Sequence, residues 1–517
     1  MKQSLLFGLV AVAWLAGCMD KLAQDSSGGR KSQAVTAAKE GFVTVDGTSF
    51  SLDGKPFNFQ GTNMWGLGLQ GYRSEQEVGR VFGQFADKGI RVVRIWGFSC
   101  RGIYYGGTPI LEGMTKGVMK YNESALVHLD ATLSSAHENG IKIILTLVNF
   151  EPELCGMEWW VQQVVGKSDK QLFYSDADVE KVYKRHVETM LTRVNTRRQI
   201  AYRDDPTILS IEISNETHTE NNFEKNQGKT PGVLVYNWIK DMTAYVRTLD
   251  QKHLISTGEE GYRITPPVGP LGTKHSWIHD GWKGVDFARN VTLPDVSFAT
   301  VHLYPDNWNI PSRDIEWVRD YLVLDRAKLA HAAGKPIVLE ESGFAKGPRF
   351  AHLGYSTNPQ YWLGQMYRFA NLGGYAGTMS WNAVPPGFAN GDYDFDFNSP
   401  EFDVIDNQVR YMNDLNLGLT PDPNVGPAPD DSVKPPCTDI APDNTYSCAQ
   451  QAAWGQCTQD WMAGFCEKTC GKCTDGTPAP CTDVAPDALH TCAEQVSWGK
   501  CKEIWMANYC NLSCGRC

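Results

Sequence analysis

The sequence contains no long apolar segment and no strongly basic block. Its longest apolar run, residues 5–15, is too short to span a bilayer as a finished helix. The formal net charge of -11 at pH 7 argues against nucleic acid as a partner. Cysteine is scarce through most of the chain, since only three of the 15 cysteines precede residue 430.

The length and composition predict several folded domains. The chain has 517 residues, more than one ordinary domain uses, with 42% hydrophobic and 21% charged residues. Aromatic residues make up 11% of the chain. Aromatic rings suit stacking on sugar rings, although most of them are expected to lie in hydrophobic cores.

The N-terminus has the features of an export signal. Lys2 precedes the apolar run, and the segment Leu15-Ala16-Gly17-Cys18 ends it. This segment resembles the bacterial lipobox, which implies that residues 1–18 are a lipoprotein signal peptide and that Cys18 is lipidated. A plain cleaved signal peptide with an incidental cysteine is the alternative.

Residues 19–40 are polar and rich in serine and glycine, which predicts a flexible tether. Asp20 is not adjacent to Cys18, so the inner-membrane retention signal of lipoproteins is not expected. We therefore expect an exported, monomeric protein that a lipid anchor holds to a membrane, at the bacterial outer membrane or the cell surface.

Twelve cysteines crowd into the last part of the chain as an internal repeat. The six cysteines of residues 437–473 recur 44 positions later in residues 481–517 with identical spacing. Even counts at fixed spacing in an exported chain predict a disulfide framework, because so small a module cannot bury an adequate core. Zinc is the alternative, but each module lacks a second CxxC pair or histidine ligands. The cysteines concerned are Cys437, Cys448, Cys457, Cys466, Cys470 and Cys473, then Cys481, Cys492, Cys501, Cys510, Cys514 and Cys517.

The pattern of residues 466–473 resembles the ShK-type six-cysteine module. That resemblance implies disulfides from the first to the sixth cysteine, the second to the fourth and the third to the fifth. The repeated tryptophans of the two modules either stack on polysaccharide or form the small cores; they are Trp454, Trp461, Trp498 and Trp505. Residues 413–436 and 474–480, rich in proline, aspartate and glycine, are predicted to be linkers.

Residues 41–412 alternate short apolar runs with amphipathic stretches, which is typical of repeated βα units. The candidate strands are residues 57–61, 92–96, 142–148, 208–214, 253–257, 298–303, 336–340 and 377–381. Eight such strands predict an α/β protein with a (β/α)₈ TIM barrel as its catalytic domain, followed by the two disulfide-rich modules. In that fold the active site lies at the C-terminal strand ends. The residues expected there are Asn63, Arg94, Asn149, Asn215, Glu216, Glu259, His302, Tyr304, Glu341 and Trp381.

Two of the candidate strands end in carboxylates. Asn215-Glu216 follows the apolar run 208–214, and Glu340-Glu341 follows the run 336–339. A charged residue is not expected at the end of a strand that is buried on both faces, so each carboxylate needs an explanation. Two facing carboxylates are what the cleavage of a glycosidic bond requires.

Motifs along the whole central domain resemble glycoside hydrolase family 5 of clan A, and most closely its endo-β-1,4-mannanase branch. They are Gly61-Thr62-Asn63, Val93-Arg94-Ile95-Trp96, Leu147-Val148-Asn149, Ser214-Asn215-Glu216, Gly258-Glu259-Glu260-Gly261, Gly284-Val285-Asp286-Phe287, the segment 302–308 and Leu339-Glu340-Glu341-Ser342-Gly343. The resemblance implies a retaining endo-β-1,4-mannanase that acts on mannan or glucomannan and needs no cofactor and no metal.

The resemblance assigns the family's catalytic roles to the matching positions of this chain. Glu216 would be the general acid/base, and Glu341 would be the nucleophile that forms a glycosyl-enzyme. Arg94 and Tyr304 would hydrogen-bond Glu341 and keep it ionised, while His302 would lie beside Glu216. Asn215 would bind the 2-hydroxyl of the sugar that is cleaved, and Trp381 would form the floor beneath that sugar. Further substrate contacts are expected from Asn63, Trp65, Asn149 and Trp308.

The chain departs from the family pattern at three places, which leaves alternatives open. Ser342 follows the second carboxylate pair where the family has an aromatic residue, so either Glu340 or Glu341 points inward; Glu341 fits the register better. Thr217-His218 and the loop 150–160 also differ, and both lie where substrate subsites are built. A β-1,4-glucanase, or a surface glycan-binding protein without activity, are the competing functions.

Cys100 and Cys155 follow the second and third candidate strands, on the expected catalytic face. We expect them to form a disulfide that holds the third loop. Two separate buried cysteines are the alternative.

Overall fold

The structure is a computed structural model. It describes residues 41–100, 107–269, 271–355, 359–389 and 391–424, and in the C-terminal region residues 439, 446–459, 462, 466, 468–471, 491–502 and 513–514. The predictions for the signal peptide 1–18 with Cys18, the tether 19–40 and the linker 474–480 lie outside these residues. In the described part of the chain, none of the helices combines the length and the apolar character that a membrane crossing demands.

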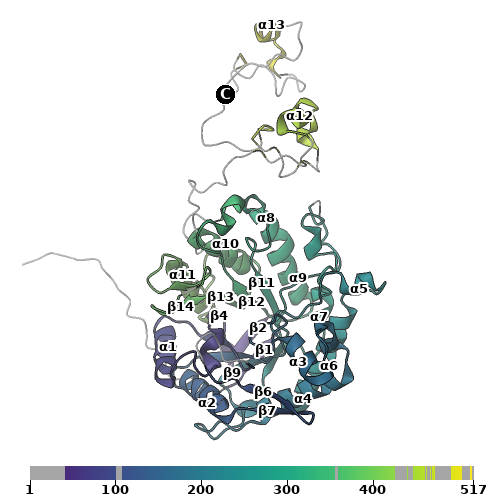
Figure 1. The fold of residues 1–517 in the computed structure, drawn as a ribbon. Coiled ribbons are helices and arrows are strands. Elements are labelled where there is room, and N and C mark those ends of the chain that lie inside the picture. Colours follow the sequence, from purple (N-terminus) through teal and green to yellow (C-terminus); the bar gives the residue numbers. More distant parts are fainter. Residues whose placement is uncertain are drawn as a thin grey trace, which may run out of the picture. The chain divides into compact units, whose positions relative to one another are not determined.

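The core of the molecule is an eight-stranded parallel sheet (Figure 1). Its order is β10-β9-β8-β5-β4-β13-β12-β11. Near the gap between β10 and β11, the backbone N–H of Ser297 donates to the carbonyl of Ile255 (2.8 Å). The fold is therefore a (β/α)₈ barrel. The strands are β4 (Phe59–Asn63), β5 (Val92–Trp96), β8 (Lys142–Thr146), β9 (Ile208–Glu212), β10 (Leu254–Ser256), β11 (Ala299–Leu303), β12 (Ile337–Ser342) and β13 (Gly377–Ser380).

All eight predicted strands are present, and every residue in them is buried. The first begins two residues later than the apolar pattern predicts, at Phe59. Phe57 instead packs against the short antiparallel sheet that precedes the barrel. That sheet consists of β1 (Val43–Asp46), β2 (Ser49–Leu52) and β3 (Lys55–Pro56).

The antiparallel sheet packs on one end of the barrel interior. Val43 and Phe50 belong to one buried cluster with apolar side chains from the barrel strands, including Phe59, Val92 and Ile144. A TIM barrel interior is a packed core and not a pore. The cluster therefore fills the barrel interior and leaves the C-terminal strand ends for the site.

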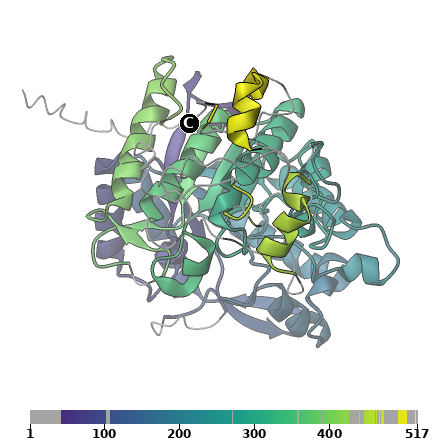
Figure 2. The same cartoon turned by 90° about the horizontal axis from the view of Figure 1, so that it is seen from above.

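Helices surround the sheet (Figures 1 and 2). Ser74 caps the first of them through a capping box, in which its hydroxyl accepts from the backbone N–H of Glu77 (3.3 Å) and its own N–H donates to the Glu77 carboxylate (3.0 Å). The long helices are α1 (Glu75–Asp87), α2 (Glu123–Glu138), α4 (Ala177–Thr192), α6 (Val233–Leu249), α9 (Leu324–Ala332), α10 (Pro359–Leu372) and α11 (Glu401–Asn416).

Further helices and short strand pairs lie in the loops between these elements. The helices are α3 (Met157–Val165), α5 (Phe223–Asn226), α7 (Phe287–Asn290) and α8 (Ile315–Val318). The strand pairs are β6 (Leu111–Thr115) with β7 (Val118–Tyr121), and β14 (Ala383–Val384) with β15 (Phe395–Asp396).

Among the described residues of the two C-terminal modules there is one short α-helix in each, α12 (Cys448–Ala453) and α13 (Cys492–Ser497). The first module has the disulfides Cys448–Cys466 and Cys457–Cys470, and the second has Cys501–Cys514. These bonds follow the second-to-fourth and third-to-fifth pairing that the ShK resemblance implies. The first-to-sixth bonds would involve Cys437, Cys473, Cys481 and Cys517, which lie outside the described residues, as does Cys510.

The described core of the first module is made of Cys448, Met462 and Cys466. Trp454 is 52% exposed, and its counterpart Trp498 in the second module is 51% exposed. These two tryptophans are therefore surface residues and not the cores of the modules. Trp461 and Trp505 lie outside the described residues.

Candidate active site

A cleft of about 820 Å³ lies at the C-terminal ends of the barrel strands. Both predicted catalytic carboxylates, Glu216 and Glu341, line it. Much of its remaining wall is aromatic, which suits a sugar chain, because the faces of sugar rings stack on aromatic rings. The aromatic lining residues are Trp96, Tyr262, Trp277, Trp282, Tyr304, Trp308, Trp381 and Tyr393.

Glu216 stands just beyond strand β9 in an unusual backbone conformation. Its φ is +49°, a left-handed value that residues with a side chain rarely adopt. The backbone N–H of Glu216 donates to the carbonyl of Gly258 (2.7 Å), and that of Asn215 donates to Val148 (2.7 Å). These two bonds hold the turn, so the Glu216 side chain reaches the cleft with 21% of its surface exposed.

Glu341 lies in β12 beside a β-bulge. In the pairing with β11, Val301 is opposite Leu339 whereas His302 is opposite Glu341, so Glu340 is an extra residue in β12. Neighbouring residues in a regular strand point to opposite faces. The bulge lets Glu340 and Glu341 both contact Arg94 and His302. Glu341 lines the cleft, as the family register predicts, while Glu340 is fully buried.

Arg94 of β5 connects the two catalytic strands. Its Nη1 donates to Glu341 Oε1 (2.6 Å), and its Nη2 donates to Asn215 Oδ1 (2.6 Å). Its Nε donates to Glu212 Oε1 (2.8 Å) deeper in the barrel. The Tyr304 hydroxyl donates to the other oxygen of Glu341 (2.6 Å). Both oxygens of Glu341 are thus bound, which fixes the direction in which this carboxylate faces.

His302 of β11 lies between the catalytic carboxylates and Glu340. Its Nδ1 is 2.9 Å from Glu216 Oε1 and 3.6 Å from Glu341 Oε1, and its Nε2 is 3.2 Å from Glu340 Oε2. Burial alone would lower the pKa of His302. The charges of Glu341 and Glu216, together with its hydrogen bonds to Glu216 and Glu340, outweigh burial and raise that pKa well above its usual value.

The proton distribution follows from these contacts. Burial favours the neutral form of Glu216, but the hydrogen bond and charge of His302 outweigh it, so the pKa of Glu216 lies below its usual value. Burial raises the pKa of Glu341 against the attraction of His302 and Arg94, and the charge of Glu216 adds to this rise. A proton on Glu216 therefore lowers the cost of a negative charge on Glu341.

Three of these residues have the spacing of a cation site. Oxygen or nitrogen atoms of Glu216, His302 and Glu341 all lie within 4.8 Å of one another. The Arg94 guanidinium already occupies Glu341 Oε1, and the raised pKa of His302 favours its positively charged form. Both positive groups oppose a divalent cation, so the cluster fits acid–base chemistry better than metal binding.

The other predicted site residues divide between the cleft surface and its support. Asn149, Asn215, Trp308 and Trp381 line the cleft. Asn63 is buried, and its amide oxygen accepts from Arg94 Nη1 (3.2 Å). Trp65 packs against the cleft residue Trp96 with 5.6 Å between ring centroids. Asn63 and Trp65 therefore contact residues that line the cleft, and their contact with a sugar stays a prediction.

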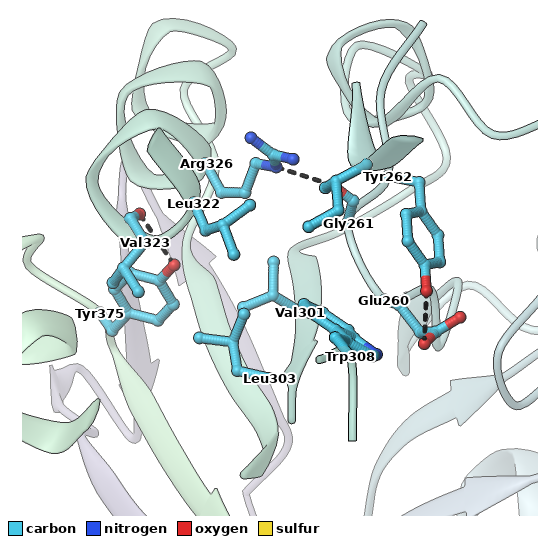
Figure 3. A pocket seen from close by; sticks show the side chains of 11 residues that line it. Glu260, Gly261, Tyr262, Val301, Leu303, Trp308, Leu322, Val323, Arg326 and Tyr375 are labelled. Carbon is cyan, nitrogen blue, oxygen red and sulfur yellow. Dashed lines mark hydrogen bonds between the residues drawn. The ribbon is translucent and has the colours of Figure 1, made fainter. Parts of the chain in front are cut away.

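Several cleft residues were not predicted. After β10 it is Glu260, and not Glu259, that lines the cleft, and its carboxylate accepts from the Tyr262 hydroxyl (3.1 Å; Figure 3). Burial and the charge of Glu216 raise the pKa of Glu260 to about 8. The segment Gly258-Glu259-Glu260 contains two adjacent carboxylates, and the sequence pattern alone does not show which of them faces the cleft. Figure 3 also shows Tyr262 and Trp308 beside a small apolar cavity behind this wall.

His218 and Lys283 form a second unpredicted contact near the acid/base. The Lys283 ammonium is 3.2 Å from His218 Nε2, and His218 Nδ1 is 2.8 Å from the backbone oxygen of Glu216. Burial and the Lys283 charge hold the pKa of His218 well below its usual value. A neutral His218 then donates from Nδ1 and accepts from Lys283 at Nε2. This contact makes the part of the cleft beside Glu216 polar.

Cys100 and Cys155 are joined in a disulfide, with 5.6 Å between their Cα atoms. The bond links the segment after β5 to the loop after β8. That loop carries the cleft residues Glu151 and Glu153.

Comparison with known proteins places this geometry in a family. Residues 40–362 match the family described as GH family 5 beta-mannosidase-like, and residues 436–473 and 480–517 each match an ShK domain-like family. The chain is 34% identical over 371 residues to mannan endo-1,4-beta-mannosidase 1 of Oryza sativa subsp. japonica, covering 67% of this chain and 79% of that protein. It is 31% identical over 315 residues to the probable mannan endo-1,4-beta-mannosidase A of Aspergillus oryzae, covering 60% and 74%.

Solved structures agree with the sequence relatives. The endo-1,4-beta-mannanase of Rhizomucor miehei superposes with a TM-score of 0.60 at 25% identity, covering 72% of this chain and 99% of that one. The endo-beta-1,4-mannanase of Thermotoga petrophila gives a TM-score of 0.58 at 28% identity, covering 70% and 78%. With its barrel, its facing carboxylates and these relatives, the chain belongs to the beta-mannosidase-like branch of glycoside hydrolase family 5, and it carries two ShK-like domains at its C-terminus.

Proposed function

We propose that this protein is a retaining endo-β-1,4-mannanase. The observation that carries the proposal is the separation of the two carboxylates, since oxygens of Glu216 and Glu341 lie within 4.8 Å. Retaining glycosidases place these groups about 5–5.5 Å apart, whereas inverting enzymes need roughly 6.5–9.5 Å to admit a water between them. The short separation supports direct attack by one carboxylate on the sugar.

In the first step, Glu341 attacks the anomeric carbon while Glu216 donates its proton to the glycosidic oxygen. The bond between the anomeric carbon and that oxygen breaks, and the leaving chain departs as an alcohol. In the second step, Glu216 takes a proton from a water that attacks the same carbon, and the Glu341 ester is released as a carboxylate. Arg94 and Tyr304 stabilise the Glu341 charge before attack and after release.

The remaining roles extend from these contacts. Asn215, held by Arg94 and by a bond from its amide to Asn149 (2.9 Å), would accept the 2-hydroxyl of the sugar that is cleaved. Trp381 and Trp308 would stack on sugar rings. The names of the two relatives, mannan endo-1,4-beta-mannosidases, support mannan and not β-1,4-glucan as the proposed substrate. They also support cleavage within the chain and not at its ends.

A reducing-sugar assay on mannan, glucomannan and carboxymethylcellulose tests the proposal. We expect product from the first two substrates, with short oligosaccharides appearing early, as internal cleavage requires. Product from carboxymethylcellulose alone would indicate a glucanase, and no product from any of the three would leave a glycan-binding protein.

The exposed rings of Trp454 and Trp498 favour a polysaccharide-binding role for the ShK-like domains. They occupy equivalent positions in the two repeats and have nearly equal exposure. About half of each side chain is open to solvent, and the face of a tryptophan ring is a suitable surface for a sugar ring. A chain with two such rings would hold the enzyme on its substrate through avidity.

The location and assembly are part of the same proposal. The lipobox-like segment before Cys18 supports a lipid-anchored enzyme at the outer membrane or cell surface, acting as a monomer. Labelled palmitate should enter the protein and fail to enter a Cys18→Ala variant. Light scattering of the detergent-free protein without its first 18 residues should give the mass of one chain.

A further inference from the structure

Glu340 is a buried carboxylate with an unusual set of neighbours. The residue is fully buried. Its Oε2 lies 3.2 Å from His302 Nε2 and 3.7 Å from Arg94 Nε. Its Oε1 is also buried, and among the described residues no conventional donor reaches that atom. Besides His302, a second carboxyl, that of Glu212, forms a hydrogen bond with the Glu340 carboxyl. Two carboxyl groups can hydrogen-bond only if one of them carries a proton.

Glu212 is placed to carry that proton. It ends strand β9 with no exposure, and its Oε1 accepts from Arg94 Nε (2.8 Å) and the Thr146 hydroxyl (2.7 Å). Burial, together with the neighbouring Glu340 charge, raises the pKa of Glu212 to about 8 against the attraction of Arg94. The pKa of Glu340 lies below its usual value: burial opposes this, but Arg94 and His302 outweigh it.

The charge balance of the site requires the same proton. Arg94 and His302 supply two positive charges, and four carboxyl groups surround them: Glu212, Glu216, Glu340 and Glu341. A water-excluded site tolerates little net charge. With His302 charged and Glu216 and Glu341 ionised, two further anions at Glu212 and Glu340 would set four negative charges against two positive ones. One proton on the Glu212–Glu340 pair reduces this excess to a single charge, and the catalytic proton is the one that His302 holds at Nδ1 for Glu216.

We propose that Glu340 is a positioning residue: it shares one proton with Glu212, and its remaining negative charge holds His302 as an imidazolium that donates from Nδ1 to Glu216. His302 then stores a proton next to the acid/base. When that proton passes to Glu216, the Nδ1–H bond breaks, an O–H bond forms on Oε1, and His302 becomes neutral with Nε2–H still bound to Glu340. The proposal rests on the role of Glu216 as general acid.

The groups that face His302 come from several strands. From β12 they are Glu340 and Glu341, from the turn after β9 Glu216, and from the β10 loop Glu260. Glu212 of β9 and Arg94 of β5 act on Glu340. Lys283 acts on Glu216 and Glu260 from farther away. Among these, Glu340 is the only carboxylate at Nε2 in the described residues.

Two isosteric variants separate a charge role from a shape role. Glu340→Gln removes the anion beside Nε2 of His302. The apparent pKa of the alkaline limb in the kcat/KM pH profile on mannan should therefore fall by about one pH unit or more. Glu212→Gln replaces a group that already carries a proton, so that limb should stay within a few tenths of a unit. Glu316→Gln, at a carboxylate with 78% side-chain exposure, is the matched control. Equal shifts in Glu340→Gln and Glu212→Gln, or no shift in either folded variant, would overturn the proposal.

A spectroscopic measurement tests the charge of His302 without relying on activity or on a Glu340 variant. In the ¹⁵N NMR spectrum of the wild-type protein at pH 7, His302 should show both ring nitrogens protonated, with its signals identified by their absence from His302→Asn. A neutral His302 ring in that spectrum would refute the proposal. If wild type degrades no mannan while His302 is doubly protonated, the enzymatic function fails and the Glu340 assignment stands.

Discussion

Glu340 and Glu341 are neighbours in sequence, yet both contact Arg94 and His302, because a bulge in β12 turns both side chains toward the same groups. Glu341 reaches the cleft, whereas Glu340 is buried behind it. One residue is thus placed to meet substrate and the other to set the charge of the histidine between the catalytic carboxylates.

Removing each of the two catalytic carboxylates should reduce activity in a different way. Glu341→Ala should lose all detectable activity on mannan and on aryl mannosides, because no group remains to form the glycosyl-enzyme. Glu216→Ala should lose about 10²–10⁴-fold on mannan but keep turnover of aryl mannosides whose leaving groups need no protonation. Steady-state rates on both substrates, with Glu316→Ala as control, provide the test. Equal residual activity in the two variants would contradict the assignment.

Arg94→Lys should damage both catalysis and stability. A lysine cannot reach Glu341, Asn215 and Glu212 together, as the guanidinium does. We expect kcat/KM to fall by about 10²-fold or more, and the free energy of unfolding to fall by about 3–5 kcal/mol, because buried carboxylates lose their partner. Kinetics and urea unfolding measure the two effects. A variant with wild-type stability would show that the Glu212 contact is not structural.

The stability of the barrel should decrease as the pH rises from about 5 to 8. The pKa of Glu212 is raised to about 8 in the folded protein from 4.5, so its contribution to folding is fully present below pH 4.5 and is lost as the pH rises through 8. Glu260 behaves in the same way, with burial as the main cause. Glu212→Gln should flatten this decrease. Urea unfolding of wild type and variant between pH 5 and 8 compares the slopes, and identical slopes would refute the shift.

The disulfide between Cys100 and Cys155 should stabilise the loop that carries Glu151 and Glu153. Replacing both cysteines by serine should lower the free energy of unfolding by about 2–4 kcal/mol, since the bond closes a span of 55 residues. KM for mannan should rise more than kcat falls, because the loop lies in the wall and not at the reacting atoms. A change confined to kcat would argue against this role.

The sequence predicts the barrel well because most of its strands are short, largely apolar segments, and Asn215-Glu216 marks the end of the fourth strand without ambiguity. The bulge at Glu340 was not predictable, since alternation along a strand assigns only one of two neighbouring carboxylates inward. For Glu259 and Glu260 the sequence also did not show which of the two neighbouring carboxylates faces the cleft. Glu212 was visible as a charge inside an apolar run, but its partners come from β5 and β12, which only the closed barrel brings together. The antiparallel strands β1 to β3 are short and largely exposed, so they lack an apolar pattern.

The exposed tryptophans of the ShK-like domains give the last prediction. Trp454→Ala with Trp498→Ala should weaken retention of the whole protein on insoluble mannan by about 10-fold or more, because each stacked ring contributes of order 1 kcal/mol and two rings act together. The double variant is made in a Glu341→Ala background, so the substrate is not consumed, and Leu419→Ala, a residue with 55% exposure after α11, is the control. Activity of the otherwise wild-type double variant on soluble mannan should be unchanged, since neither ring belongs to the cleft. If retention is the same with and without the two rings, the domains hold something other than mannan; if activity on soluble mannan falls as well, the rings act on the barrel and not on the polysaccharide surface.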